Sequence, residues 1–138
     1  MIETYRGTVY PWECDFFGHL NVRHYIAKFD EATWQFLSMY GLSPNYLKNS
    51  GTGIFTVEQH VKYHHELVAG DLIIVKSKLL QIKPKVVEYQ HVIINTQTQE
   101  IAAQMKLKGV LVDLISRRSC PFPSSIHNRL VEALAGQY

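Results

Sequence analysis

Hydrophobic and polar positions divide the chain into one helical stretch and several extended ones. Between residues 22 and 40, apolar or aromatic side chains recur every three or four residues, the spacing of one face of an α-helix. This face consists of Val22, Tyr25, Ile26, Phe29, the semi-apolar Thr33, Phe36, Leu37 and Tyr40. Asn21 is a favoured N-cap residue, and Gly41 stands where a left-handed residue commonly ends a helix. The pattern predicts a helix over 22–40, about 28 Å long, whose apolar face needs a broad surface to cover it.

From Ile54 onward the period changes to two, which is typical of β-strands. The first of these strands is expected to place Phe55, Val57, Val61 and Tyr63 on one face and Glu58, His60, Lys62 and His64 on the other. The same alternation predicts strands over 72–82, 86–96 and 101–111, and residues 3–12 form an earlier strand. Residues 42–53 are expected to be a loop and 116–123 irregular, with Ser124 capping a short helix through Leu134.

The predicted order is one strand, a long helix and four long antiparallel strands. Such a half-buried sheet, with its one long helix laid against one face, is a two-layer α+β arrangement. The 138 residues suit a single domain, 1–138, that is large enough to bury a core.

Composition and charge exclude several classes of protein. Hydrophobic residues make up 46% and charged residues 19% of the chain, which is typical of a globular protein. The net charge of +2 comes from scattered basic residues, so we expect no nucleic-acid partner. No apolar run approaches the ~20 residues of a membrane span, and we expect no membrane association. Cys14 and Cys120 have neither metal nor redox spacing, which favours a reducing, cytoplasmic location.

Candidate chemistry is concentrated in the bend before the helix. Glu13, Asp15, Gly18, His19 and Asn21 fall within nine residues there. Asp15 stands between the end of a strand and the start of a helix, among aromatic neighbours, where a carboxylate can act as general base or nucleophile. The helix N-terminus that follows can stabilise a developing oxyanion. The alternative, that Asp15 and Asn21 only hold the turn and cap the helix, is left open by these residues.

The bend motif resembles that of a known family. The pattern Asp-x-x-Gly-His-x-Asn, followed by Tyr25 and by Phe-Asp-Glu-Ala over 29–32, is similar to the 4-hydroxybenzoyl-CoA thioesterase group of hotdog-fold acyl-CoA thioesterases. The resemblance continues at Val61, Lys62 and Tyr63, at the Gly70-Asp71 turn, and at Arg117, Arg118, Pro121 and Pro123. It covers essentially the whole chain.

This resemblance implies a hotdog fold, in which a curled antiparallel sheet wraps one long central helix. It also implies acyl-CoA hydrolysis, in which Asp15 attacks the thioester carbonyl or activates water, and amides near Gly18 and Val22 polarise that carbonyl. Homodimers with a continuous sheet are expected, with homotetramers as an open alternative. CoA would enter as part of the substrate, and no separate cofactor or metal is expected.

The resemblance also suggests residues for substrate binding. The residues suggested for substrate binding are Tyr25, Glu31, His60, Tyr63, Lys85, Arg117 and Arg118. The last three are candidates for the CoA phosphates, and solvated surface charge is the alternative for each. Trp34, Phe36, Tyr63 and His60 could line an acyl pocket or belong to the core. Several relatives carry His or Tyr where this chain has Val22, so His19 or Asn21 would substitute for that side chain, or the helix amides would act alone.

Two other functions are weighed against hydrolysis. One is a hotdog dehydratase, whose His–acid pair is not found here. The other is a non-catalytic module that binds acyl-CoA. The alternating histidines His60, His64 and His65 lack the acidic cluster of a metal site, and His91 is expected to be a hydrogen-bonded core histidine. Thioester hydrolysis remains the leading hypothesis.

Overall fold

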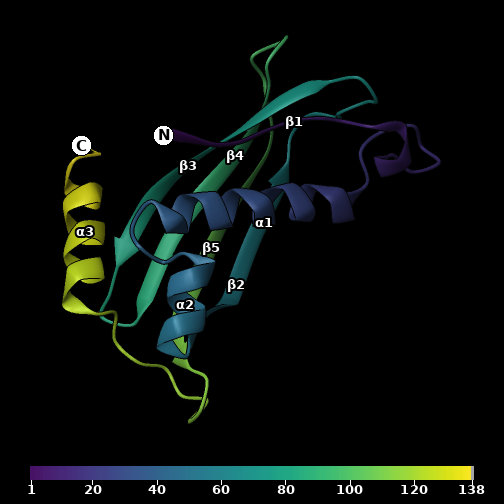
Figure 1. Ribbon diagram of the computed structural model, residues 1–138. Helices are drawn as coiled ribbons and strands as arrows, with labels where there is room; N and C mark the ends of the chain where they lie inside the picture. The colour runs from purple at the N-terminus through teal and green to yellow at the C-terminus, as the bar shows by residue number, and fades with distance from the viewer. Residues whose placement is uncertain (138) are drawn as a thin grey trace.

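A computed structural model describes residues 1–137 and shows one antiparallel sheet with a long helix across one face (Figure 1). In chain order the elements are β1 (Ile2–Thr8), the 3₁₀ turn η1 (Pro11–Glu13), α1 (Val22–Ser38), α2 (Pro44–Ser50), β2 (Thr52–Tyr63), β3 (Leu72–Ile82), β4 (Val86–Asn95), β5 (Ile101–Asp113) and α3 (Ser124–Ala135). The five strands lie in the order β1-β3-β4-β5-β2, with every neighbouring pair antiparallel. The predicted α+β arrangement is confirmed.

Helix α1 forms because its apolar face and its caps agree. Phe29 and Phe36 are fully buried against the sheet, and burying one such side chain contributes about 2 kcal/mol. The Asn21 side chain accepts from the Arg23 N–H (3.1 Å), so the predicted N-cap is confirmed. The α-helix ends at Ser38, slightly before the expected residue 40, and Gly41 has the left-handed φ of +95° that the sequence predicts there.

The sheet supplies the surface that α1 requires. Alternate residues of β3, β4 and β5 are buried, as the predicted period of two requires, and they include Ile73, Val75, Leu79, Val87, Tyr89, His91, Ile93, Ala103, Met105, Leu107 and Leu111, whereas Ile101 at the start of β5 is exposed. His91 is hydrogen-bonded on both ring nitrogens, to Ser77 Oγ (2.6 Å) and Thr33 Oγ1 (2.9 Å). The expectation of a core histidine with satisfied hydrogen bonds is therefore confirmed.

The predicted faces of β2 are wrong in one respect. A β-bulge between Thr56 and Glu58 inserts an extra residue, which reverses the side on which the following side chains point. Phe55 pairs with the outward residue Val110, whereas Tyr63 pairs with the buried Ala103 on the helix side. Phe55 and Tyr63 therefore lie on opposite faces of the sheet.

Three local boundaries also differ from the sequence-based expectations. The expected loop over 42–53 contains α2, because Ser43 caps it, Pro44 begins it and Gly51 ends it in a left-handed conformation. The first strand ends at Thr8, and Pro11–Glu13 forms a separate 3₁₀ turn. Ser124 is the first residue of α3 and not its cap, since Pro123 occupies that position without a side-chain hydrogen bond.

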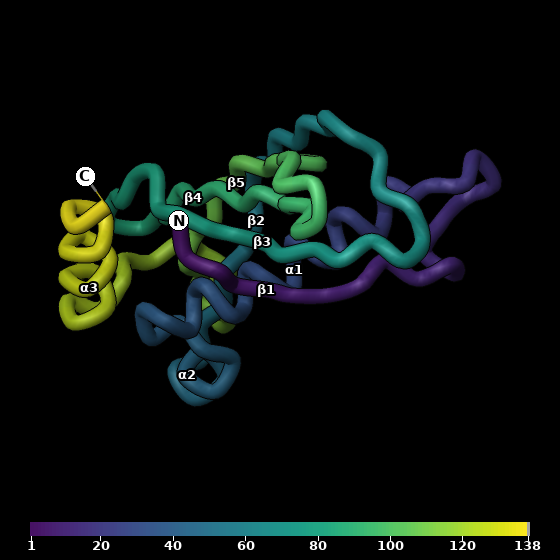
Figure 2. Tube along the Cα trace, turned by 90° about the horizontal axis from the view of Figure 1, so that it is seen from above, coloured from purple at the N-terminus to yellow at the C-terminus, as the bar shows by residue number. Residues whose placement is uncertain are grey.

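Helix α3 closes the end of the sheet opposite the bend (Figure 2). Its residues Ile126 and Leu130 are buried in the core. The Gln137 side chain pairs with the backbone of Leu79, donating to its carbonyl (2.8 Å) and accepting from its N–H (2.9 Å). Gln137 thereby continues the edge of β3 beyond the end of β1. Within residues 1–137, no helix is long and apolar enough to cross a bilayer.

Candidate active site

The bend between β1 and α1 is a tight antiparallel loop. Cys14 pairs with Leu20 in an isolated β-bridge. Inside it, the Asp15 N–H donates to the His19 carbonyl (3.1 Å) and the Gly18 N–H donates to the Asp15 carbonyl (3.0 Å). Gly18 has a φ of +89°, a conformation that glycine adopts at no steric cost. The loop therefore reverses at Gly18 and returns the chain to the start of α1.

The Asp15 carboxylate lies against the N-terminus of that helix. Its Oδ1 accepts from the Phe17 N–H (2.9 Å), and its Oδ2 accepts from the Asn21 side-chain amide (3.2 Å). Asn21 in turn caps the helix through the Arg23 N–H. Among the described residues, no group accepts from the Val22 N–H. One carboxylate and one free helix amide thus border the same space, with the positive end of the helix dipole beside them.

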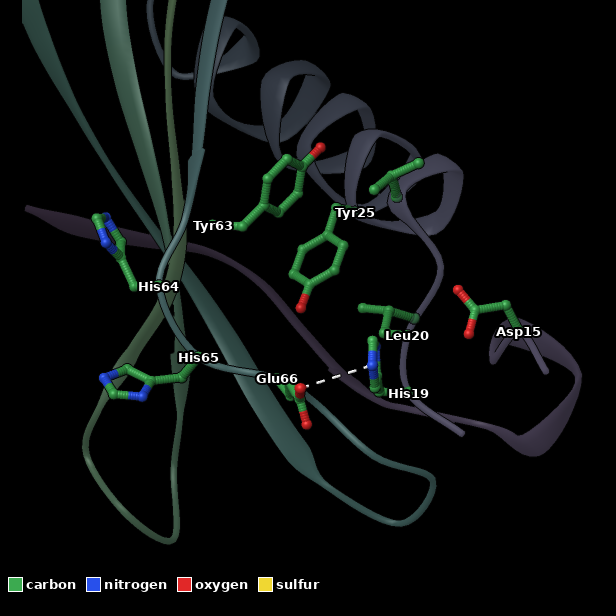
Figure 3. A pocket seen from close by; sticks show the side chains of 9 residues that line it. Asp15, His19, Leu20, Tyr25, Tyr63, His64, His65 and Glu66 are labelled. Carbon is green, nitrogen blue, oxygen red and sulfur yellow. Dashed lines mark ion pairs between the residues drawn. The ribbon is translucent and has the colours of Figure 1, made fainter. Parts of the chain in front are cut away.

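A cavity of about 350 Å³ opens beside Asp15 (Figure 3). The bend, the first turn of α1, and the end of β2 with the residues after it supply its walls. Its lining consists of Asp15, His19, Leu20, Val22, Tyr25, Tyr63, His64, His65 and Glu66. The Leu20 N–H donates to the Leu67 carbonyl (2.7 Å), which fixes the bend to the segment after β2. The cavity is therefore built by segments that are far apart in the sequence.

Two tyrosines and one polar pair give the cavity its character. The rings of Tyr25 and Tyr63 meet edge to face, with their centroids 5.1 Å apart. Burial, reinforced by the neighbouring Tyr63, raises the pKa of Tyr25 to about 12, so its phenol is uncharged near neutral pH. His19 Nε2 lies 3.6 Å from Glu66 Oε1 at the opening of the cavity (Figure 3).

An ion pair between Glu13 and Lys28 attaches the start of the bend to α1. The Lys28 ammonium, which is buried, donates to Glu13 Oε2 (2.9 Å), and the Tyr10 N–H donates to Glu13 Oε1 (2.9 Å). Burial of the Glu13 carboxyl favours its neutral form, but the bonds from Tyr10 and Lys28 outweigh this effect and lower its pKa. Glu13 precedes Asp15 by two residues, so this pair fixes the start of the bend on α1.

The predicted site residues fall into two groups. Asp15, His19, Val22, Tyr25 and Tyr63 line the cavity, with Gly18 and Asn21 shaping the bend beside it.

The remaining predicted site residues lie outside this cavity, elsewhere in the same subunit. Glu31 lies beside Tyr5. Burial, and to a smaller extent Glu31, raises the pKa of Tyr5 to about 12. His60 pairs with Lys106 on the outer face of the sheet, away from α1, because the β2 bulge turns it there. For Phe36 the sequence left two alternatives, the acyl pocket and the core. The side chain is fully buried and belongs to the core.

Three basic candidates stand at the far end of the sheet. Asp113 pairs with Thr52 at the start of β2, and its N–H donates to the Arg118 carbonyl. The Lys85 carbonyl accepts from the Leu111 N–H near the same end. Tyr63 is at the other end of β2, roughly 35 Å away at the usual rise per strand residue. Lys85, Arg117 and Arg118 therefore do not border the cavity of their own subunit.

Sequence reasoning did not identify Leu20 or Glu66 as site residues, and it considered His64 and His65 only as metal ligands. All four line the cavity. Glu66 lies in an irregular segment with no periodicity, so nothing local to the sequence pointed to it. No group of three or more histidine, cysteine or acidic side chains in the described part of the chain could hold a metal ion.

Comparison with known proteins decides the family. The model of the thioesterase-like superfamily matches residues 9–130. The chain belongs to this superfamily. It is 32% identical over 135 residues to the betainyl-CoA thioesterase of Pseudomonas aeruginosa, covering 98% of this chain and 84% of that protein. It is also 27% identical over 116 residues to an Agrobacterium fabrum protein named L-carnitine dehydrogenase/betainyl-CoA thioesterase, covering 84% of this chain and 24% of that protein.

The fold agrees with this assignment. A Staphylococcus aureus protein solved in complex with CoA superposes with a TM-score of 0.89 at 22% identity, covering 98% of this chain and 87% of that one. The hotdog fold expected from the bend motif is confirmed, with α2 and α3 added to the central helix. Membership of the superfamily likewise confirms the sequence-based identification of this protein as a thioester hydrolase.

Proposed function

We propose that this protein hydrolyses acyl-CoA thioesters at the cavity beside Asp15. The observation that carries the proposal is the Asp15 carboxylate, held by Phe17 and Asn21 at the N-terminus of α1, next to the free Val22 amide. A base and an oxyanion donor in one cavity are the two groups that acyl transfer to water requires.

In the proposed reaction the thioester carbonyl accepts a hydrogen bond from the Val22 N–H. The Asp15 carboxylate then takes a proton from water as the water oxygen attacks the carbonyl carbon, or it attacks that carbon itself and forms an anhydride that water hydrolyses. In both routes the carbon–sulfur bond breaks, the thiolate of CoA leaves, and a proton returns to the sulfur. The Val22 side chain takes no part, and Asn21 acts by orienting the Asp15 carboxylate.

The acyl group that we propose is a small one bearing a quaternary ammonium, as in betainyl-CoA. Both curated relatives carry betainyl-CoA thioesterase in their names. The cavity supports this choice, since about 350 Å³ is near the lower limit for a ligand site, which suits a short acyl group.

We propose a homodimer formed through β2. This strand is an edge of the sheet and exposes Phe55 and Val57, and exposed edges are sites of strand pairing. Two β2 strands paired antiparallel about a twofold axis would bring the Thr52 end of one subunit near the Tyr63 end of the other. Arg117 and Arg118 would then approach the partner's cavity, where CoA phosphates could reach them. Further pairing into tetramers and a cytoplasmic location stay predictions from the sequence.

Hydrolysis is tested with Asp15→Asn, by following thiol release from a panel of acyl-CoA substrates. Loss of the base should lower kcat about 100- to 10,000-fold. Asp71→Asn is the matched control, because the Asp71 carboxylate also accepts a backbone N–H within a turn (Val68, 2.9 Å) but lies outside the cavity lining. Equal rates for wild type and Asp15→Asn on every thioester would refute the proposal.

A further inference from the structure

The wall of the cavity across from Asp15 is aromatic. Tyr63, at the end of β2, is 47% exposed, while Tyr25, in the first turn of α1, is only 4% exposed. Their edge-to-face contact, at 5.1 Å and an interplanar angle of 75°, turns the two rings so that they meet at one side of the cavity (Figure 3). The buried Tyr25 thus supports Tyr63, whose ring is available to a ligand.

The fixed charges in the lining of the cavity are negative. Its lining, among the residues that the structure describes, contains the carboxylates of Asp15 and Glu66 and neither a lysine nor an arginine. Glu66 stands three residues after Tyr63, and its side chain is largely exposed at the opening. The lining also contains His19, His64 and His65, which can carry a positive charge, and His19 Nε2 lies 3.6 Å from Glu66 Oε1. An acyl group with its own positive charge is therefore attracted to this wall, and a neutral or anionic one is not.

We propose that Tyr63 and Glu66 are the specificity-determining residues of this thioesterase, and that together they hold the ammonium group of the acyl chain. This inference rests on the proposed function and adds the residues responsible for substrate choice. A cation over the face of a tyrosine ring is attracted by the ring quadrupole, and a nearby carboxylate adds direct charge attraction. Tyr25 is a positioning residue, because it contacts Tyr63 and is itself buried.

In this proposal one wall of the cavity binds the thioester carbonyl and the other binds the ammonium group. The thioester carbonyl belongs at Val22 and Asp15, on the bend and the helix. In a trimethylammonioacetyl group the charged nitrogen is separated from that carbonyl by a single methylene. In the proposed binding mode a short acyl group places its carbonyl at Val22 and its cation at Tyr63 and Glu66, all of which line the same cavity.

The test compares two substrates of the same shape. Trimethylammonioacetyl-CoA carries the cation, and 3,3-dimethylbutyryl-CoA replaces the nitrogen by carbon and so removes only the charge. We expect wild type to prefer the cationic substrate about tenfold in kcat/KM, which lies between the strengths of an exposed and of a desolvated cation–π contact. Tyr63→Leu and Glu66→Gln should each lower this ratio several-fold. Tyr63→Phe, which keeps the ring, should retain most of it.

Glu100→Gln is the matched control for Glu66→Gln. Glu100 is a surface carboxylate, 3.6 Å from His65 and outside the lining of the cavity, so its removal should leave the ratio as in wild type. A wild-type ratio near one would overturn the proposal. So would a ratio that neither Tyr63→Leu nor Glu66→Gln changes.

A binding measurement separates this inference from the proposed function. Saturation-transfer NMR with glycine betaine and with 3,3-dimethylbutyrate reports the same discrimination without any hydrolysis. Preference for betaine that is lost in Tyr63→Leu supports the aromatic–acidic wall even if no thiol is released, in which case only the proposed function fails. Thiol release from the panel without any preference for the cation, in kinetics and in binding, would leave the proposed function in place and refute this inference.

Discussion

Glu13 and Lys28 form an ion pair of 2.9 Å on the side of the bend that faces α1. The Lys28 side chain is only 5% exposed, and the Glu13 side chain 15%. Through this contact the short 3₁₀ turn is held on the helix, and Asp15 follows two residues later. The position of the proposed catalytic carboxylate therefore depends on a pair of charges that do not themselves line the main cavity.

Removing one partner of this pair should be costly. Lys28→Met leaves the Glu13 carboxylate buried without its cation, and we expect a loss of about 3 kcal/mol in the free energy of unfolding, measured with urea. The double variant Glu13→Gln/Lys28→Met should recover much of this loss, since no charge is then unpaired. Glu3→Gln, in the exposed Arg6–Glu3 pair, should cost less than about 1 kcal/mol. Equal effects of the Lys28 and Glu3 substitutions would contradict this account.

The Asn21 side chain should matter to activity as well as to stability. Asn21→Ala removes the cap of α1 and the donor to Asp15, and Ser43→Ala removes the equivalent cap of α2, which accepts from the Tyr46 N–H. Each should cost about 1 kcal/mol of unfolding free energy. Only Asn21→Ala should also lower kcat, because it frees the Asp15 carboxylate to turn. Comparable thiol-release rates in the two variants would show that Asn21 is a cap and nothing more.

His91 should make the protein less stable in acid. Burial lowers the pKa of its imidazole to about 3, against about 6.5 when unfolded. Because the folded state holds the neutral ring, its stability is complete above pH 6.5 and falls by about 1.4 kcal/mol per unit as the pH drops from 6.5 toward 3. Urea unfolding of wild type and of His91→Gln between pH 7 and 5 checks this, and the variant should show the shallower dependence. If the stability of wild type and of His91→Gln depended on pH in the same way, His91 would not be the cause of the loss of stability in acid.

The Gln137 side chain should protect the edge of β3. Its amide makes two hydrogen bonds with the Leu79 backbone, each contributing about 1 kcal/mol. In Gln137→Ala the Leu79 amide should exchange with deuterium more than tenfold faster. The exchange rate of the Val75 amide should stay the same, because Val75 is paired with Tyr5 of β1. Unchanged exchange at Leu79 would mean that water replaces the glutamine without loss.

Introducing a charge on the edge strand β2 should dissociate the proposed dimer. Val57 is 62% exposed, so Val57→Lys is compatible with the fold of one subunit but places a charge where a second strand would pair. Light scattering after gel filtration should report a monomer for this variant and a dimer for wild type. Val131→Lys, at an exposed position of α3, should remain dimeric. A monomeric wild type would exclude pairing through β2.

Local patterns were sufficient for most of the fold. The helix α1 and the strands β3, β4 and β5 follow from periodicity, because a period of 3.6 or 2 requires only that one face be buried. The position of Asp15 before the helix also follows, since the carboxylate and the helix N-terminus are neighbours in sequence. Helix α2 was missed although its Ser43, Pro44 and Gly51 signals were present, because the same residue types also mark loops.

The sequence by itself thus determined the α+β architecture, the family and the carboxylate beside the helix, all of which depend on residues close together in the chain. Only the tertiary structure decided which residues share the cavity. Glu66 reaches it because Leu20 bonds to Leu67, and Lys28 is buried because Glu13 lies over it. The β2 bulge placed Tyr63 toward α1 and His60 away from it. Such contacts join segments tens of residues apart, and no local period of hydrophobic positions records them.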